Sequence, residues 1–231
     1  MRSKKRRFAA HVAKPPPRAH LRFMQDDYAP PPVDDETMAA LERETPILSR
    51  LRRFADGLDR IAWFSRLGEP PTAALREAAE GYLDRLGFPD AELSILPDWE
   101  DAEGAAETEG WSSPAWEAEE LARADLTANA LTVMSEEALE IGLRMVAERA
   151  GEACRAAMEE EAAYWDVEEE SARTLAVGAA AQAAHLAALS LIAAAVDPDS
   201  PADDSVFAWK LRLFMEGRWP VGVLGGTFNV F

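Results

Sequence analysis

The chain has 231 residues, of which 48% are hydrophobic, and its formal net charge is −18. This length and apolar content predict a packed core in one domain of good size, or in a domain with a small subdomain, and argue against a disordered coil. The negative charge argues against nucleic acid or an anionic bilayer as the main partner of the folded part, because both would be repelled.

Residues 1–33 are predicted to form a flexible, basic, proline-rich arm. Residues 1–22 hold eight Lys and Arg and no acid, and two runs of three prolines follow at 15–17 and 30–32. Consecutive prolines favour an extended path, and no secretory signal is visible. A basic cluster in this arm is a candidate contact for nucleic acid or, more in keeping with the acidic remainder, for an acidic protein surface: Lys4, Lys5, Arg6 and Arg7.

Residues 34–96 are predicted to form an N-terminal helical hairpin lobe. The first helix, after Pro46, carries apolar residues at spacings of three and four: Ile47, Leu51, Phe54, Leu58 and Ile61. The second is expected to begin after the N-cap Thr72 and to end at Gly87. Its predicted buried stripe is Leu75, Ala79, Tyr82 and Leu86.

Residues 97–113 are predicted to be an acidic linker that contains tryptophan. Residues 97–120 hold nine acids, no base and three of the seven tryptophans: Trp99, Trp111 and Trp116. Acidic residues keep such a segment soluble while the aromatic rings offer anchors to a partner. The alternative is a surface loop whose rings pack back onto the neighbouring lobe.

Residues 114–217 are predicted to form a helical bundle. The segment 135–165 begins with the N-cap Ser135, and the single cysteine, Cys154, lies on its apolar stripe. One cysteine excludes an intramolecular disulfide and a Cys-based zinc site and suits the cytoplasm. Residues 174–196 carry no formal charge, which meets the length of roughly 20 residues needed to cross a bilayer. Because alanine dominates this segment, we expect a central core helix and no membrane insertion.

Two polar side chains, Gln182 and His185, share one face of that central helix. Buried polar groups need hydrogen-bond partners, and Tyr164 or an acid from another helix is a candidate. The pair is therefore either a satisfied part of the core or the lining of a ligand pocket in the bundle. The second reading makes the chain a small-molecule-binding or enzymatic bundle.

Residues 218–231 are predicted to form an aromatic tail with the character of a short β-hairpin. Gly225 and Gly226 form an acceptable two-residue turn between two stretches rich in β-branched and aromatic residues. Three aromatic side chains are its candidate anchors, either on the bundle or, as a docking peptide, on a partner: Trp219, Phe228 and Phe231.

Catalytic and metal-binding motifs are absent from the sequence. There is no Glu-x-x-His pair, phosphate loop or nucleophile elbow, so we expect no catalytic residue, metal or cofactor. The predicted fold is all-α, with an N-terminal αα-hairpin lobe, a bundle around a central apolar helix and a hairpin-like tail. The predicted function is that of a non-enzymatic protein-interaction protein, an assembly factor or adaptor with a protein partner.

Overall fold

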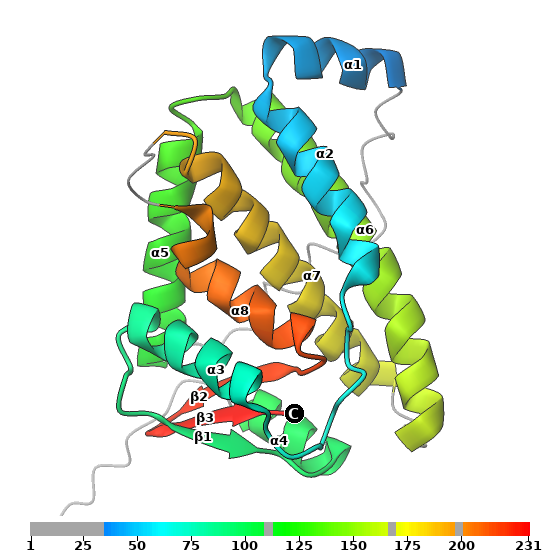
Figure 1. Cartoon of the computed structure of the whole chain (residues 1–231), viewed down its shortest axis with the longest axis vertical. Coiled ribbons are helices and arrows are strands. Elements are labelled where there is room, and N and C mark those ends of the chain that lie inside the picture. The colour runs from blue at the N-terminus through cyan, green and yellow to red at the C-terminus, as the bar shows by residue number, and fades with distance from the viewer. Residues whose placement is uncertain (1–34, 109–112, 166–169, 197–200) are drawn as a thin grey trace, which may run out of the picture. The chain divides into compact units, whose positions relative to one another are not determined.

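Helices make up most of the computed structural model, which describes residues 35–108, 113–165, 170–196 and 201–231 (Figure 1). The arm of residues 1–33, with its basic cluster, lies outside the described residues. The all-α class and the short C-terminal hairpin are confirmed. In chain order the elements are α1 (Asp35–Glu44), α2 (Ile47–Gly57), the short helix η3 (Leu58–Arg60), α3 (Ala73–Leu86), β1 (Glu92–Ile95), α4 (Trp99–Thr108), α5 (Pro114–Ala130), α6 (Glu136–Trp165), α7 (Glu170–Ala193), the short helix η4 (Ala202–Asp204), α8 (Val206–Met215), β2 (Pro220–Leu224) and β3 (Thr227–Val230).

Helix α7 is the central element of the bundle, as its uncharged sequence predicts. It packs against α2, α5, α6 and α8, which lie around it in Figure 1. The span Ala172–Ala193 is long and apolar enough to cross a membrane, but 67% of its most apolar window is buried within the protein. Its many alanines allow neighbouring helices to approach closely. The structure thus accounts for the apolar character of α7 by its place in the core.

The ends of α3 are set by the residues that the sequence indicated. The Thr72 Oγ1 accepts a hydrogen bond from the Leu75 N–H at 3.0 Å, and Gly87 ends the helix in the left-handed region at φ 89°. These groups satisfy backbone polar atoms that a helix leaves free at its ends. All four residues of the predicted stripe of α3 are buried.

The two N-terminal helices predicted as a hairpin pack against different partners. Helix α2 lies on α6, where a Cβ added at Gly142 would be 2.7 Å from Leu51 Cδ1. Helix α3 lies on α8, where a Cβ at Gly81 would be 2.3 Å from the Trp209 ring. Both crossings therefore bring a helix backbone directly against a large side chain. Leu51 and Leu58 of the predicted stripe are buried, whereas Leu48 and Ala55 are buried next to the half-buried Ile47 and Phe54.

The small sheet has the strand order β1-β3-β2. Strands β2 and β3 form the predicted antiparallel hairpin, and Gly225 takes φ 60° in its turn. Strand β1 was not predicted. It pairs in parallel with β3, so residues far apart in the chain complete the sheet.

The segment 97–113 contains a helix where the sequence suggested a linker. Asp98 begins it by accepting a hydrogen bond from the Asp101 N–H at 3.0 Å, and α4 then runs to Thr108. The described residues before and after this segment belong to one compact unit, Asp35–Phe231.

Three helices meet at a polar network that is mostly buried. The Glu119 carboxylate of α5 accepts hydrogen bonds from the Tyr82 hydroxyl of α3 and from the Lys210 ammonium of α8, both at 2.6 Å. A charged donor and acceptor make strong hydrogen bonds, and the two buried heads satisfy each other. This network joins α5 to the layer formed by α3 and α8.

Candidate interaction surface

Helix α4 is anchored to the sheet by one tryptophan. The Trp99 side chain is 8% exposed, and its ring centroid lies 5.7 Å from that of Trp219 and 5.0 Å from that of Phe231, which it meets edge to face. Ala102, one turn later, is fully buried. Aromatic clusters of this kind contribute both buried area and favourable ring geometry. The anchor fixes which side of α4 faces the solvent.

The outer face of α4 is acidic. Four carboxylates are exposed at its start and along it, and none of the ion pairs found in the described part of the chain involves them: Asp98, Glu100, Asp101 and Glu107. Residues 86–122 contain no lysine or arginine at all. A single-sign surface of this kind attracts a positively charged partner and repels an acidic one.

The other two tryptophans of the acidic segment have different positions. Trp116 is half-buried in the first turn of α5, where its N–H donates to the N-cap Ser113 Oγ at 3.1 Å. Trp111 lies outside the described residues. Of the two tryptophans of this segment that the structure describes, Trp99 is buried and Trp116 is partly exposed.

The aromatic residues of the tail are part of the core. The side chains of Trp219, Phe228 and Phe231 are at most 3% exposed. Phe228 lies 5.2 Å from Tyr82 between ring centroids, and the backbones of Trp219 and Phe231 exchange two hydrogen bonds of 2.7 and 2.8 Å. In the structure the aromatic side chains of the tail pack within the protein itself, which is the first of the two alternatives given for them. The rings of Trp219 and Phe231 contact Trp99 of α4, and the ring of Phe228 contacts Tyr82 of α3.

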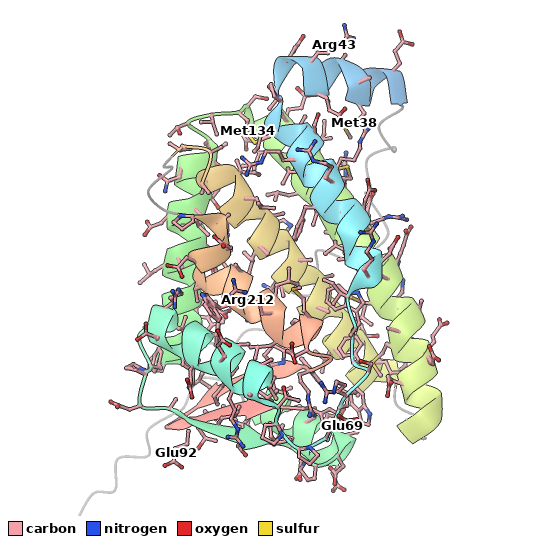
Figure 2. All side chains as sticks on the ribbon, viewed as in Figure 1. Met38, Arg43, Glu69, Glu92, Met134 and Arg212 are labelled. Carbon is pink, nitrogen blue, oxygen red and sulfur yellow. The ribbon has the colours of Figure 1, made fainter. Side chains whose placement is uncertain are left out.

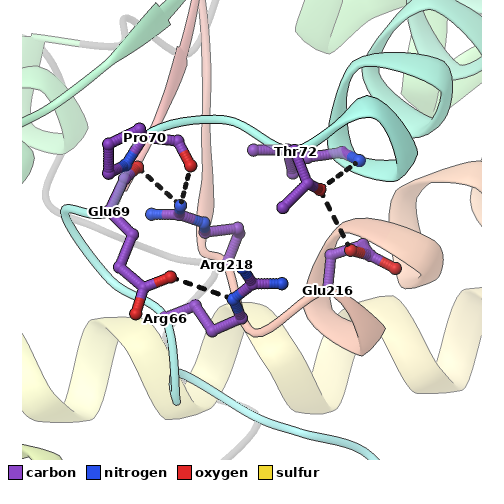
Figure 3. Close-up of polar contacts among 7 residues, drawn as sticks. Arg66, Glu69, Pro70, Thr72, Glu216 and Arg218 are labelled. Atoms are coloured by element: carbon purple, nitrogen blue, oxygen red, sulfur yellow. Dashed lines mark hydrogen bonds and ion pairs between the residues drawn. The ribbon is translucent and has the colours of Figure 1, made fainter.

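A buried arginine ties the tail to the loop before α3, which carries Glu69 (Figure 2), and no pattern in the sequence indicated this contact. Arg218 is 1% exposed and donates to the carbonyl oxygens of Glu69 and Pro70 at 2.5 and 3.1 Å (Figure 3). Burial lowers the pKa of its guanidinium, and the nearby Glu69 acts against that shift. Beside it, the Thr72 hydroxyl donates to the Glu216 carboxylate at 3.4 Å, so an acid of the protein itself lies at the start of α3.

Of the predicted ligand-binding residues, Gln182 and His185 lie in the described part of the chain, on helix α7. Gln182 is exposed, because the helices around α7 do not cover it, and His185 is half-buried. The side chain of Tyr164 lies outside the described residues. Two shallow hollows, of about 330 and 210 Å³, lie near the β2–β3 turn, and both have Phe88 and Gly225 in their lining but neither Gln182 nor His185. No group of three or more potential metal ligands occurs in the part of the chain that the structure describes.

His185 makes the stability of the fold depend on pH. Burial lowers the pKa of its imidazole, and the positive charge of Arg123 on α5 lowers it further. The unfolded chain, with a histidine pKa of about 6.5, therefore takes up this proton first as the pH falls. The contribution to stability is complete above about pH 6.5 and decreases as the pH falls toward the folded pKa.

We therefore expect H185Q to lose less stability than the wild type between pH 7.5 and pH 5.5. The measurement is the free energy of unfolding by urea at each pH, with H20Q in the basic arm as the control that should behave as the wild type. Equal pH dependence in the wild type and H185Q would show that the imidazole is not desolvated in the folded protein.

Cys154 is a packing residue of α6. Its side chain is fully buried, and burial raises the pKa of its thiol to about 12, although Arg155 acts in the opposite direction. At pH 8 the thiolate fraction is then about 10⁻⁴, roughly a thousandfold below that of an ordinary thiol. We expect no labelling of the native protein by a thiol-specific disulfide reagent within an hour, and one thiol labelled within minutes in denaturant. Rapid labelling of the native protein would place the thiol at the surface.

Comparison of the chain with protein-family models, with curated proteins and with solved structures finds no match.

Proposed function

We propose that this protein is a non-enzymatic interaction protein, an assembly factor or adaptor, whose protein partner binds the acidic face of α4. The observation that supports it best is the combination of a buried anchor and an exposed charge. Trp99 holds the helix on the sheet, while Asp98, Glu100, Asp101 and Glu107 point their charge at solvent without a basic neighbour in the same segment. Charge complementarity would give such a surface its specificity and its association rate.

The residues that the sequence indicated as partner-binding differ in how accessible they are to a partner. The tail rings and Trp99 are buried, so a partner would reach them only after the core opened. Trp116, half-buried at the start of α5, is the aromatic residue that we assign to the partner surface. The basic arm, residues 1–33, supports a second contact by its charge alone, and nucleic acid is proposed as a partner only there. A cytoplasmic location suits the single buried thiol.

The test compares the partners captured from the native lysate by two charge variants. One variant neutralises α4 with E100Q, D101N and E107Q. The matched control neutralises three exposed carboxylates on α3 with E77Q, E80Q and D84N. Circular dichroism should confirm that both variants fold, since each acid in the first turn of α4 contributes about 0.3–1 kcal/mol against the helix dipole.

We expect a partner that the wild type and the α3 variant retain and the α4 variant loses, and raised salt should weaken its capture. The proposal fails if no protein is captured reproducibly by the wild type, or if the partner binds all three proteins equally.

A further inference from the structure

Within the residues that the structure describes, strand β1 has no neighbouring strand on one of its two sides. It lies at one end of the sheet order β1-β3-β2, and the strand at the other end, β2, contacts α4 and α8. Figure 1 shows β1 as the lowest of the three strands, with β3 on its inner side. An outer strand presents a row of backbone donors and acceptors that another chain can pair with.

The backbone groups available at that edge belong to Leu93 and Ile95. The N–H of Glu92 donates to the Gly226 carbonyl at 2.9 Å, and the N–H of Leu96 donates to the Val230 carbonyl at 2.8 Å. Alternate residues of a strand direct their backbone groups to opposite sides, so Leu93 and Ile95 direct theirs away from β3. No hydrogen bond to these groups occurs within the described part of the chain. Two donors and two acceptors are thus left for an added strand.

The surroundings of this edge are acidic. Glu92 lies within the strand, and Asp90 and Asp98 flank it; all three are exposed. The nearest basic residues along the chain are Arg85 and Arg123. Two copies of β1 placed edge to edge would bring these carboxylates together, and like charges across a strand pair are destabilising. The charges therefore disfavour the pairing of β1 with β1 of a second copy and favour an added strand that carries basic side chains.

We propose that β1 accepts an extended, lysine- or arginine-rich segment of a partner protein as an added strand. This inference rests on the proposed function and gives its partner a chemistry and a binding mode. Main-chain hydrogen bonds to Leu93 and Ile95 supply the pairing, and the carboxylates around β1 select basic side chains.

The experiment uses the full chain and a ten-residue peptide of alternating lysine and threonine with blocked ends. Two control peptides separate pairing from charge. One has the same sequence with methyl groups on the backbone nitrogens of its four central residues, which removes donors and keeps the charge. The other alternates glutamate and threonine. Affinity is measured by fluorescence anisotropy, and the exposure of individual amides is measured by hydrogen exchange.

We expect the lysine peptide to bind and to slow exchange at the Leu93 and Ile95 amides. We expect methylation to weaken binding at least tenfold and the glutamate peptide not to bind. In the protein, E92Q with D98N should weaken binding by about tenfold at low salt, whereas D56N on α2, an exposed acid elsewhere, should leave it unchanged. Equal binding of the methylated peptide, or unchanged exchange at Leu93 and Ile95, overturns the inference.

A further protein variant separates this inference from the proposed function. I95P removes an outward N–H that the fold does not use, and proline is tolerated in outer strands at such positions. If the native partner is captured by the wild type and equally by folded I95P, the strand-addition inference fails while the proposed function stands. If the wild type captures no partner, the proposed function itself fails.

Discussion

Replacing Trp99 by alanine is expected to lower the free energy of unfolding by about 3–5 kcal/mol, the usual loss for a buried aromatic residue. The Trp99 ring fills the space between α4 and the tail and contacts Trp219 and Phe231. Its removal leaves a cavity and frees α4 from the sheet. Urea unfolding monitored by circular dichroism provides the measurement.

The control for this prediction is W116A. Trp116 is only half-buried, so we expect a loss of less than about 1.5 kcal/mol. W99F is an informative intermediate, because the Trp99 Nε1 is buried without a hydrogen-bond partner in the described structure and phenylalanine removes that group. We expect W99F to cost less than half of W99A. A loss below about 1 kcal/mol in W99A would mean that the ring is not part of the core.

The second large effect concerns the glycine where α3 crosses α8. The Cβ introduced by G81A would lie 2.3 Å from Trp209 Cε3, closer than any normal contact. Trp209 has little freedom to move, because the guanidinium groups of Arg85 and Arg212 lie 4.9 and 3.9 Å from its ring. We expect G81A to lower the free energy of unfolding by roughly 2–3 kcal/mol.

Replacing Gly178 by alanine should instead raise the free energy of unfolding. Gly178 lies inside α7, and no atom lies within 4 Å of the position of an added Cβ. Alanine is the better helix former by about 0.5–1 kcal/mol, so G178A should stabilise the protein by that amount. The double variant G81A with W209L should lose less free energy of unfolding than the sum of the losses in the two single variants, because leucine at position 209 relieves the contact with the added Cβ. Strict additivity would contradict the packing described for this crossing.

Local signals in the sequence predicted the helix ends best. Thr72, Gly87 and Ser135 act through groups within a few residues of themselves, so their roles follow from the chain alone. The central position of α7 could also be predicted from the sequence, because an uncharged helix of that length must be shielded from water by neighbouring elements. On α2, Leu51 is buried as predicted, but Leu48 is buried in place of Ile47, because Leu48 and Leu51 both lie against α6 at Gly142.

What sequence reasoning missed depends on partners far away in the chain. Strand β1 has four residues, and it is a strand because β3 lies beside it. No local pattern indicated that Arg218 is buried, because its two carbonyl acceptors belong to the distant residues Glu69 and Pro70. Gln182 was expected in the core from its helical face, but no neighbouring helix covers that position. The acidity of residues 97–113 could be read from the composition of that segment. The burial of Trp99 could not, because Trp99 packs against Trp219 and Phe231 of the distant tail.

The order of strands also bears on how the protein is made. The middle strand, β3, follows every other described element in the chain, and both β1 and the Trp99 anchor depend on it. During synthesis on a ribosome, β1 and α4 therefore emerge long before the segment that completes them. Until then the apolar side of α4 and both edges of β1 are open to wrong pairing or to a chaperone. The acids of residues 86–122, by repelling other nascent copies, would protect the chain through that interval.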